Sequence, residues 1–255
     1  MLDAIDDPAE AVRRDGFAVV PGVLGGAAVD ALVDAVDRAG PLDAVLRRVE
    51  EVYGMRDLLR AIPEVRRLAG SPALRDLVGG VLGPGSFAVR GLLFDKSPGA
   101  NWGVPWHQDL TIAVRRRVPA PGFGPWTVKA GITHVRPPAG VLQGMLTLRV
   151  HLDDCNEARG PLRVVPGSHA GGRLGPESTR DWLGRVPAVD CPVPAGGVLL
   201  MRPLLLHASS AATVPVRRRV VHLEYAAGPL PGGVDWFETV GGSRGEVHED
   251  ARDRQ

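Results

Sequence analysis

The stretch FAVRGLLF, residues 87–94, marks the point at which the chain changes character. From here on the apolar runs are short and bounded by Pro and Gly, a pattern typical of β-strands. Further runs of this kind occupy residues 126–133, 145–152, 162–165, 198–206 and 220–225. Because the strands follow one another without long helical stretches between them, they predict an antiparallel double sheet, that is, a jelly roll or a barrel.

Ahead of residue 87 the apolar period is helical. Within residues 27–40, four apolar side chains fall at i, i+3, i+4 and i+7, and Gly40-Pro41 predicts the end of that helix. The same spacing recurs at residues 58–62 and 74–82, and a short strand is expected at 16–21. We therefore expect one domain over residues 1–241, with a helical part at 1–86, a jelly-roll core at 87–241, and a flexible tail at 242–255.

The composition bounds the class of protein. The chain has 255 residues, 44% of them hydrophobic, which is enough to bury a sizeable core. Its 30 Lys and Arg residues balance 29 Asp and Glu residues, which argues against nucleic acid as a partner. Cys155 and Cys191 match no zinc-site spacing and are expected to be reduced. No signal peptide or membrane span is recognisable, so we expect a cytoplasmic monomer or homodimer with no membrane partner.

A candidate metal site lies in Trp106-His107-Gln108-Asp109. A His and an Asp at i, i+2 on a strand point to the same face, so both could reach one ion. His207 directly follows the apolar run 198–206 and offers a third ligand. Two His and one carboxylate on one face leave coordination positions open, the arrangement of non-haem Fe(II) oxygenases.

Two residues beyond His207 sharpen this interpretation. Arg218 follows His207 by eleven residues, across a turn-like segment at 210–215. An antiparallel return would bring Arg218 beside the metal, where a guanidinium could grip a carboxylate bidentately. Ser209 shares the face of His207 and could donate a further hydrogen bond. An iron ion with a carboxylate clamp nearby indicates 2-oxoglutarate as cosubstrate.

Here a family resemblance becomes visible. The segment GPLRVVPGSH, residues 160–169, resembles the signature of the phytanoyl-CoA dioxygenase family. Residues 106–109 resemble that family's metal motif, and the spacing from His207 to Arg218 is similar to that of its distal ligand and 2-oxoglutarate arginine. The resemblance covers residues 87–225. It implies a double-stranded β-helix (a cupin-like jelly roll) with N-terminal helices, and Fe(II), 2-oxoglutarate and O2 as cofactors.

The resemblance also implies a reaction, although not the substrate phytanoyl-CoA. The expected reaction is hydroxylation of an unactivated C–H bond in a small molecule, with release of succinate and CO2. Asp109 fills the position that halogenating relatives leave open for chloride, so hydroxylation is favoured over halogenation. Two other classes remain open: a cupin-like metal enzyme that does not use 2-oxoglutarate, and a non-catalytic jelly-roll binding module.

Several basic residues suggest an anionic ligand. Where the family commonly carries a tryptophan, this chain has Arg149, which could hold 2-oxoglutarate or an anionic substrate. Lys96, at the end of the first predicted core strand, could contact either. The run Arg115–Arg117 is interpreted as a solvated face, with attraction of an acidic substrate as the alternative. The proline-rich stretch 115–140 is expected to be a long loop that closes over the site as a lid.

The other histidines compete with these assignments. His151 and Asp153 form a second His-x-Asp pair, but the 160–169 signature should follow the metal motif by several strands, which favours His107 and Asp109. His151 is then a hydrogen-bonded strand histidine near the pocket. His169 lies in a turn and is expected to bond to the backbone. His222 falls on the same face as Arg218, so it could reach the pocket.

Overall fold

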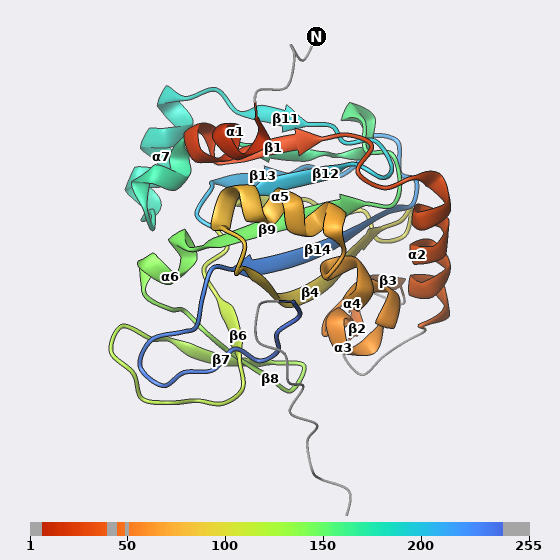
Figure 1. Ribbon diagram of the computed structural model, residues 1–255. Coiled ribbons are helices and arrows are strands. Elements are labelled where there is room, and N and C mark those ends of the chain that lie inside the picture. Colours follow the sequence, from red (N-terminus) through yellow and green to blue (C-terminus); the bar gives the residue numbers. More distant parts are fainter. Residues whose placement is uncertain (1–6, 40–44, 49–50, 242–255) are drawn as a thin grey trace, which may run out of the picture.

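Two facing β-sheets, covered on one side by helices, form the body of the molecule (Figure 1). The computed structural model describes residues 7–39, 45–48 and 51–241, so the predictions for Gly40-Pro41 and for the tail 242–255 lie outside the described residues. The helices are α1 (Pro8–Asp15), α2 (Gly26–Arg38), α3 (Leu58–Ala61), α4 (Pro63–Ala69), α5 (Pro72–Leu82), α6 (Ala139–Gln143) and α7 (Pro176–Arg185), with the 3-10 turns η1 (Glu157–Arg159) and η2 (Ser168–Gly171).

All strand pairs given for the described residues are antiparallel. The strands are β1 (Phe17–Val20), β2 (Val45–Arg48), β3 (Glu51–Met55), β4 (Phe87–Lys96), β5 (Val104–His107), β6 (Ile112–Val114), β7 (Trp126–Lys129), β8 (Ile132–Val135), β9 (Met145–His151), β10 (Leu162–Val164), β11 (Val189–Cys191), β12 (Val198–Met201), β13 (His207–Ser209) and β14 (Arg218–Ala226). The major sheet has the order β1-β12-β9-β14-β4-β3-β2, and the minor sheet the order β11-β10-β13-β5. The expected jelly roll with N-terminal helices is confirmed.

Alternation along the central strands builds a core on each face of the major sheet. On β12, Leu200 packs with the helices while Leu199 and Met201 face the minor sheet, because successive side chains point to opposite faces. On β9, Leu148 likewise faces the helices. The inner face of β9 and β14 carries polar side chains instead, and this departure from an apolar interior locates the site.

The N-terminal part is not helical throughout. Strands β1, β2 and β3 join the major sheet, with β1 pairing with β12 and β3 with β4. The period of residues 58–82 correctly predicts helices, although the structure breaks it into α3, α4 and α5. The proline at the start of α4 and again at the start of α5 supplies the helical φ but no N–H, so each marks a first turn.

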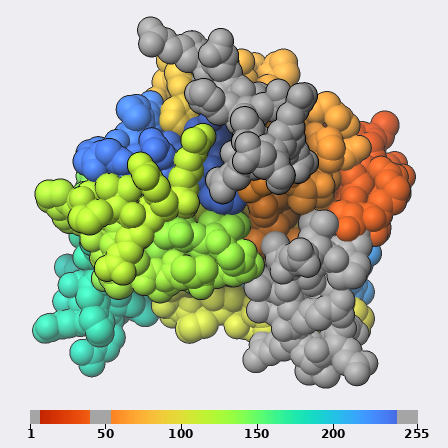
Figure 2. Space-filling model, turned by 90° about the horizontal axis from the view of Figure 1, so that it is seen from below, coloured from red at the N-terminus to blue at the C-terminus, as the bar shows by residue number. Residues whose placement is uncertain are grey.

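The stretch 115–140 is not the loop that its prolines suggest. It contains the hairpin β7–β8, which pairs with β6 in a third sheet of order β6-β8-β7. The apolar run 126–133 is broken at Ala130-Gly131, where both residues adopt positive φ. In Figure 2 this segment, in yellow-green, forms part of the molecular surface.

Two expectations about the environment of the chain can be compared with the structure. Cys155 and Cys191 are both free and buried, as expected for reduced thiols. Among the helices of the described residues, none is long and apolar enough to cross a membrane.

The core on the helical side of the major sheet gives a stability prediction. Replacing Leu148, which is 0% exposed, with Ala leaves a cavity and should lower the free energy of unfolding by about 2–5 kcal/mol. Equilibrium unfolding in urea measures this change. Val128→Ala, at a side chain 69% exposed on β7, is the control and should change the free energy by less than about 0.5 kcal/mol. Equal effects of both substitutions would contradict the assigned core.

Candidate active site

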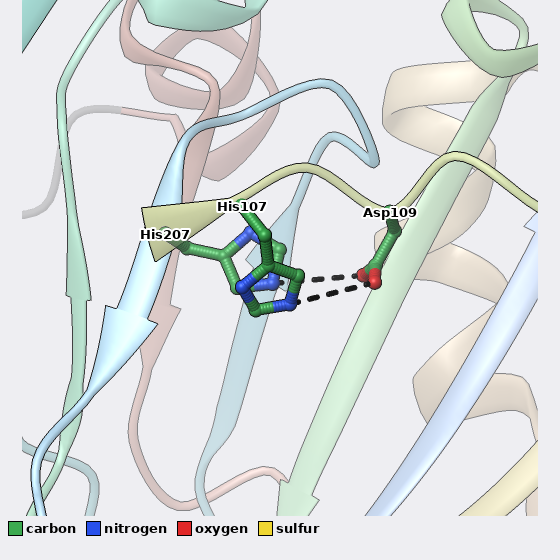
Figure 3. Close-up of side chains that lie close together, drawn as sticks. All are labelled: His107, Asp109 and His207. Carbon is green, nitrogen blue, oxygen red and sulfur yellow. Dashed lines mark ion pairs between the residues drawn. The ribbon is translucent and has the colours of Figure 1, made fainter. Parts of the chain in front are cut away.

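His107, Asp109 and His207 converge on one point (Figure 3). Each offers a ligand atom, and these atoms all lie within 4.8 Å of one another. The Nε2 atom of His107 lies 4.0 Å from Oδ1 of Asp109, and that of His207 lies 3.7 Å from Oδ2. These separations are too long for hydrogen bonds but suit three donors around a common ion.

The protonation of this trio fits a metal site. The Nδ1 atoms of His107 and His207 lie 2.8 Å from the carbonyl oxygens of Pro105 and Leu205. Since a carbonyl oxygen only accepts, each Nδ1 carries the hydrogen and each Nε2 presents a lone pair towards Asp109. The Oδ2 atom of Asp109 is buried and has no hydrogen-bond partner. An orphaned carboxylate oxygen facing two imidazole lone pairs is what a divalent cation would satisfy.

The local electrostatics keep Asp109 and His207 in the forms that bind a metal. Burial alone would raise the pKa of Asp109, but the neighbouring His207 and His222 oppose it and the net effect lowers this pKa to about 2. Burial lowers the pKa of His207 to about 4, against the attraction of Asp109. Near neutral pH Asp109 is therefore ionised and His207 is neutral.

Asp109 does not lie on the strand that carries His107. Strand β5 ends at His107, and the N–H of Asp109 donates to the carbonyl of Pro203 at 2.9 Å. The intervening Gln108 holds this turn: its Nε2 donates to the carbonyls of Leu204 and Gly172, at 2.6 and 2.8 Å. Its Oε1 accepts from the N–H of Leu174 at 2.8 Å. Sequence reasoning missed this function of Gln108, whose partners lie more than sixty residues away along the chain.

The 160–169 signature holds the neighbouring segments in place. Gly160 has φ +64, and a Cβ there would lie 2.5 Å from the carbonyl oxygen of Ser210, so only glycine fits. Its own carbonyl accepts from Nη1 of Arg218 at 2.9 Å. At the other end of the signature, Oγ of Ser168 accepts from the N–H of Leu206 at 2.9 Å, directly before His207. The signature thus positions two of the predicted site residues.

A cavity of about 90 Å³ lies beside the trio, between the major and minor sheets. All seven of the predicted site residues line it. The lining residues are Phe94, Lys96, Trp102, Val104, His107, Asp109, Arg149, Leu162, His207, Ser209, Arg218 and His222. No lining residue comes from 115–140, and the expectation that this segment closes over the site as a lid stays a prediction. The run Arg115–Arg117 is exposed, in agreement with a solvated face.

Arg218 reaches the cavity by a different route from the one expected. It begins β14 of the major sheet, whereas His207 lies on β13 of the minor sheet, so the two face each other across the sandwich. Arg218 stands opposite Lys96 of β4 in the strand register. The Nζ atom of Lys96 donates to the carbonyl of Ser210 at 2.7 Å and lies 3.4 Å from Oγ of Ser209. Burial, aided by Arg218, lowers the pKa of Lys96 to about 7.

Arg149 and His222 form a second polar pair in the cavity wall. They stand opposite each other on β9 and β14, and Nη1 of Arg149 lies 3.1 Å from Nδ1 of His222. The guanidinium also lies over the ring of Phe94, 5.2 Å from its centroid. His222 therefore reaches the pocket, as its strand face suggested.

Two further histidine predictions have different outcomes. His169 bonds to the backbone as expected, with Nε2 3.3 Å from the carbonyl of Arg13. His151 is buried, but neither of its ring nitrogens has a hydrogen-bond partner, so the expectation of a hydrogen-bonded strand histidine is wrong. It is absent from the His107, Asp109 and His207 group.

The chain matches the family model described as phytanoyl-CoA dioxygenase (PhyH) over residues 12–220. It is 27% identical over 246 residues to L-proline trans-4-hydroxylase of Streptomyces griseoviridis, covering 83% of this chain and 82% of that protein. It is 28% identical over 171 residues to ectoine dioxygenase of Bordetella parapertussis, covering 64% and 49%. The solved structure of AviO1 from Streptomyces viridochromogenes Tue57 is similar with a TM-score of 0.65 and 25% identity, over 89% of this chain and 99% of that one.

The chain belongs to the phytanoyl-CoA dioxygenase family. It is a 2-oxoglutarate-dependent non-haem iron dioxygenase, with Fe(II), 2-oxoglutarate and O2 as its cofactors. Of the three classes left open by the sequence, this excludes the binding module and the cupin-like enzyme that does not use 2-oxoglutarate.

The choice between the two His-x-Asp pairs can be tested by metal binding. Replacing His107 or His207 with Ala removes a donor and should lower Fe(II) affinity by more than about 100-fold. Anaerobic calorimetric titration with Fe(II) measures this loss. His151→Ala is the matched control and should leave the affinity unchanged. If His151→Ala abolishes binding and His107→Ala does not, the ligand assignment is wrong.

Proposed function

We propose that this enzyme hydroxylates an unactivated C–H bond of a small molecule, with His107, Asp109 and His207 holding Fe(II). When bound, the iron and its cosubstrate supply the oxidising power: 2-oxoglutarate and O2 become succinate and CO2, and one oxygen atom enters the substrate C–H bond. Asp109 occupies a coordination position that halogenation would need open, which supports hydroxylation.

We assign the distal carboxylate of 2-oxoglutarate to Arg218, Lys96 and Ser209. These three side chains line one cavity, from β14, β4 and β13, and all are buried. The Nε atom of Arg218 is buried without a partner, although Nη1 is occupied by the carbonyl of Gly160. A buried cation of this kind gains most from a carboxylate.

The observation that carries the proposal is the orphaned Oδ2 of Asp109, which faces two imidazole lone pairs in a cavity that also holds three cations. The apolar side chains of Phe94, Val104 and Leu162 lie in the same wall and exclude water from the reacting centre. The trio is open on one side, because the side chains of His107 and Asp109 are 38% and 25% exposed but that of His207 only 5%. We expect the substrate to approach from this open side.

Anaerobic titration of the Fe(II) protein with 2-oxoglutarate tests the assignment of the site. A visible charge-transfer band is expected because a keto acid chelates an iron that has open positions in a facial triad. Adding O2 and a panel of small-molecule metabolites should then reveal the substrate by stimulated succinate release and a hydroxylated product. The absence of a band in the wild type would contradict the proposed site.

The lowered pKa of Lys96 makes cosubstrate binding depend on pH. With a pKa of about 7, Lys96 loses its proton as the pH rises from about 6 to 8, so affinity for a dianion should fall by up to about tenfold per pH unit above 7. Binding at about pH 8 should also take up a proton, because the carboxylate restores the charged amine. Calorimetry in buffers of different ionisation enthalpy measures this uptake. Lys96→Met should abolish it, and unchanged uptake in that variant would exclude Lys96 as the source.

A further inference from the structure

Arg149 is a buried cation that forms no ion pair within the described residues. Its residue is 8% exposed, and among the described residues no carboxylate forms an ion pair with it. Its Nε is buried and has no hydrogen-bond partner, while Nη1 lies 3.1 Å from Nδ1 of His222. Burying a guanidinium without a counter-charge is unfavourable, so the arrangement implies an anionic ligand that is not part of the chain.

A series of hydrogen bonds and an ion pair between side chains holds the guanidinium of Arg149 in position. Because Arg149 only donates, Nδ1 of His222 must accept, which leaves the ring hydrogen on Nε2. That Nε2 lies 3.3 Å from Oε1 of Glu224, and Glu224 in turn forms an ion pair with Arg90. Arg90 also donates to the carbonyl of Thr111, two residues beyond Asp109. These interactions therefore connect Arg149 to the turn that carries Asp109, a predicted metal ligand.

The strand register places Arg149 at the metal end of the cavity. On the inner face of β14, Arg218 and His222 are four residues apart, which separates their Cα atoms by about 13 Å. Lys96 stands opposite Arg218, and Arg149 stands opposite His222. Lys96 lies beside Ser209, two residues past His207, and the charges of Arg218 and, less strongly, of Asp109 act on Arg149, so Arg149 lies between these two groups. Arg218 and Lys96 hold the other end.

The depth of Arg149 favours the cosubstrate over the substrate as its ligand. The open side of the trio lies at His107 and Asp109, whereas Arg149 and His222 lie in the closed wall. 2-Oxoglutarate carries a carboxylate at each end, and the distal one already has Arg218, Lys96 and Ser209.

We propose that Arg149 binds the keto-acid carboxylate of 2-oxoglutarate, and that His222 and Glu224 are positioning residues that hold Arg149 for this purpose. This inference rests on the proposed function, since it assumes that the cavity takes 2-oxoglutarate beside a metal held by His107, Asp109 and His207. Each carboxylate of 2-oxoglutarate would then have a cation beside it. The family signature alone does not predict the cation beside the metal, which is Arg149.

Titrations with two keto acids distinguish binding at the metal end of the cavity from binding at its distal end. 2-Oxoglutarate and pyruvate share the keto-acid end, but pyruvate lacks the distal carboxylate. In anaerobic titrations of the Fe(II) protein, Arg149→Gln should weaken both ligands by about 10- to 100-fold, the range of a hydrogen bond to a charged group. Arg218→Gln should weaken 2-oxoglutarate alone. Fe(II) affinity without keto acid is the control and should not change in Arg149→Gln.

The positioning residues have their own test. His222→Leu should reproduce the loss of 2-oxoglutarate affinity, and His222→Gln should restore much of it, because an amide can accept from Arg149 and donate to Glu224. In the Arg149→Gln background, His222→Leu should cause no further loss. A residue that merely supported the fold would lower affinity in both backgrounds.

The outcomes distinguish this inference from the function on which it rests. A wild-type protein that binds neither keto acid contradicts the proposed function. A wild type that binds both, with unchanged affinities in Arg149→Gln, overturns only the inference. Loss of 2-oxoglutarate affinity with pyruvate affinity retained would place Arg149 at the distal end and overturn it as well.

Discussion

The antiparallel pairing of β5 with β13 places His107 directly opposite His207, and the site depends on this register. A slip of one residue would turn one imidazole to the other face of the minor sheet and destroy the convergence with Asp109. Short strands specify register weakly, and here β5 has four residues and β13 three. The register is therefore reinforced from outside the strands. The side chain of Gln108 bonds the end of β5 to Leu204 and Gly172. Ser168, near the end of the 160–169 signature, accepts a hydrogen bond from Leu206 just before β13.

The two sheets contribute different chemistry to the same cavity. The minor sheet and the turn that follows β5 carry the three candidate metal ligands, whereas Lys96, Arg149 and Arg218 stand on the major sheet. Cations on one wall and lone pairs on the other suit a ligand that has carboxylates and also chelates a metal. Arg218 was expected to return beside His207 on a neighbouring strand. It does not, because the segment after Ser209 crosses from the minor sheet to the major sheet. Gly160, the first residue of the 160–169 signature, makes this crossing possible, because it has no Cβ and the carbonyl of Ser210 can therefore approach it closely.

The sequence predicts much of this, because strand alternation and ligand chemistry are local properties. The strands β4, β9 and β14 follow from runs of apolar residues, and the candidate metal ligands from the motif at 106–109 and from His207. Long-range contacts could not be predicted in this way. The hydrogen bonds of Gln108 join segments far apart in the chain, and the carbonyl acceptors give no signal of their own. Within 115–140 the strand run expected at 126–133 is confirmed, whereas the prolines suggested a loop, and nothing local predicts that β7 and β8 pair with β6 outside the two main sheets. His151 was expected to be hydrogen-bonded, since nothing local distinguishes it from a strand histidine with partners.

The distribution of burial in the cavity bears on the order in which ligands enter. Lys96, Arg149 and Arg218 are all buried, while the side chains of His107 and Asp109 are the more exposed part of the trio. A ligand held by the buried cations must pass the open side before it reaches them. A substrate seated on that open side would block this passage. Under the proposed function, this distribution of burial favours entry of 2-oxoglutarate before the substrate. Under the proposed function the buried Lys96, Arg149 and Arg218 face the cosubstrate, whereas Arg115–Arg117 are exposed, so the charge of the cavity does not by itself define the substrate.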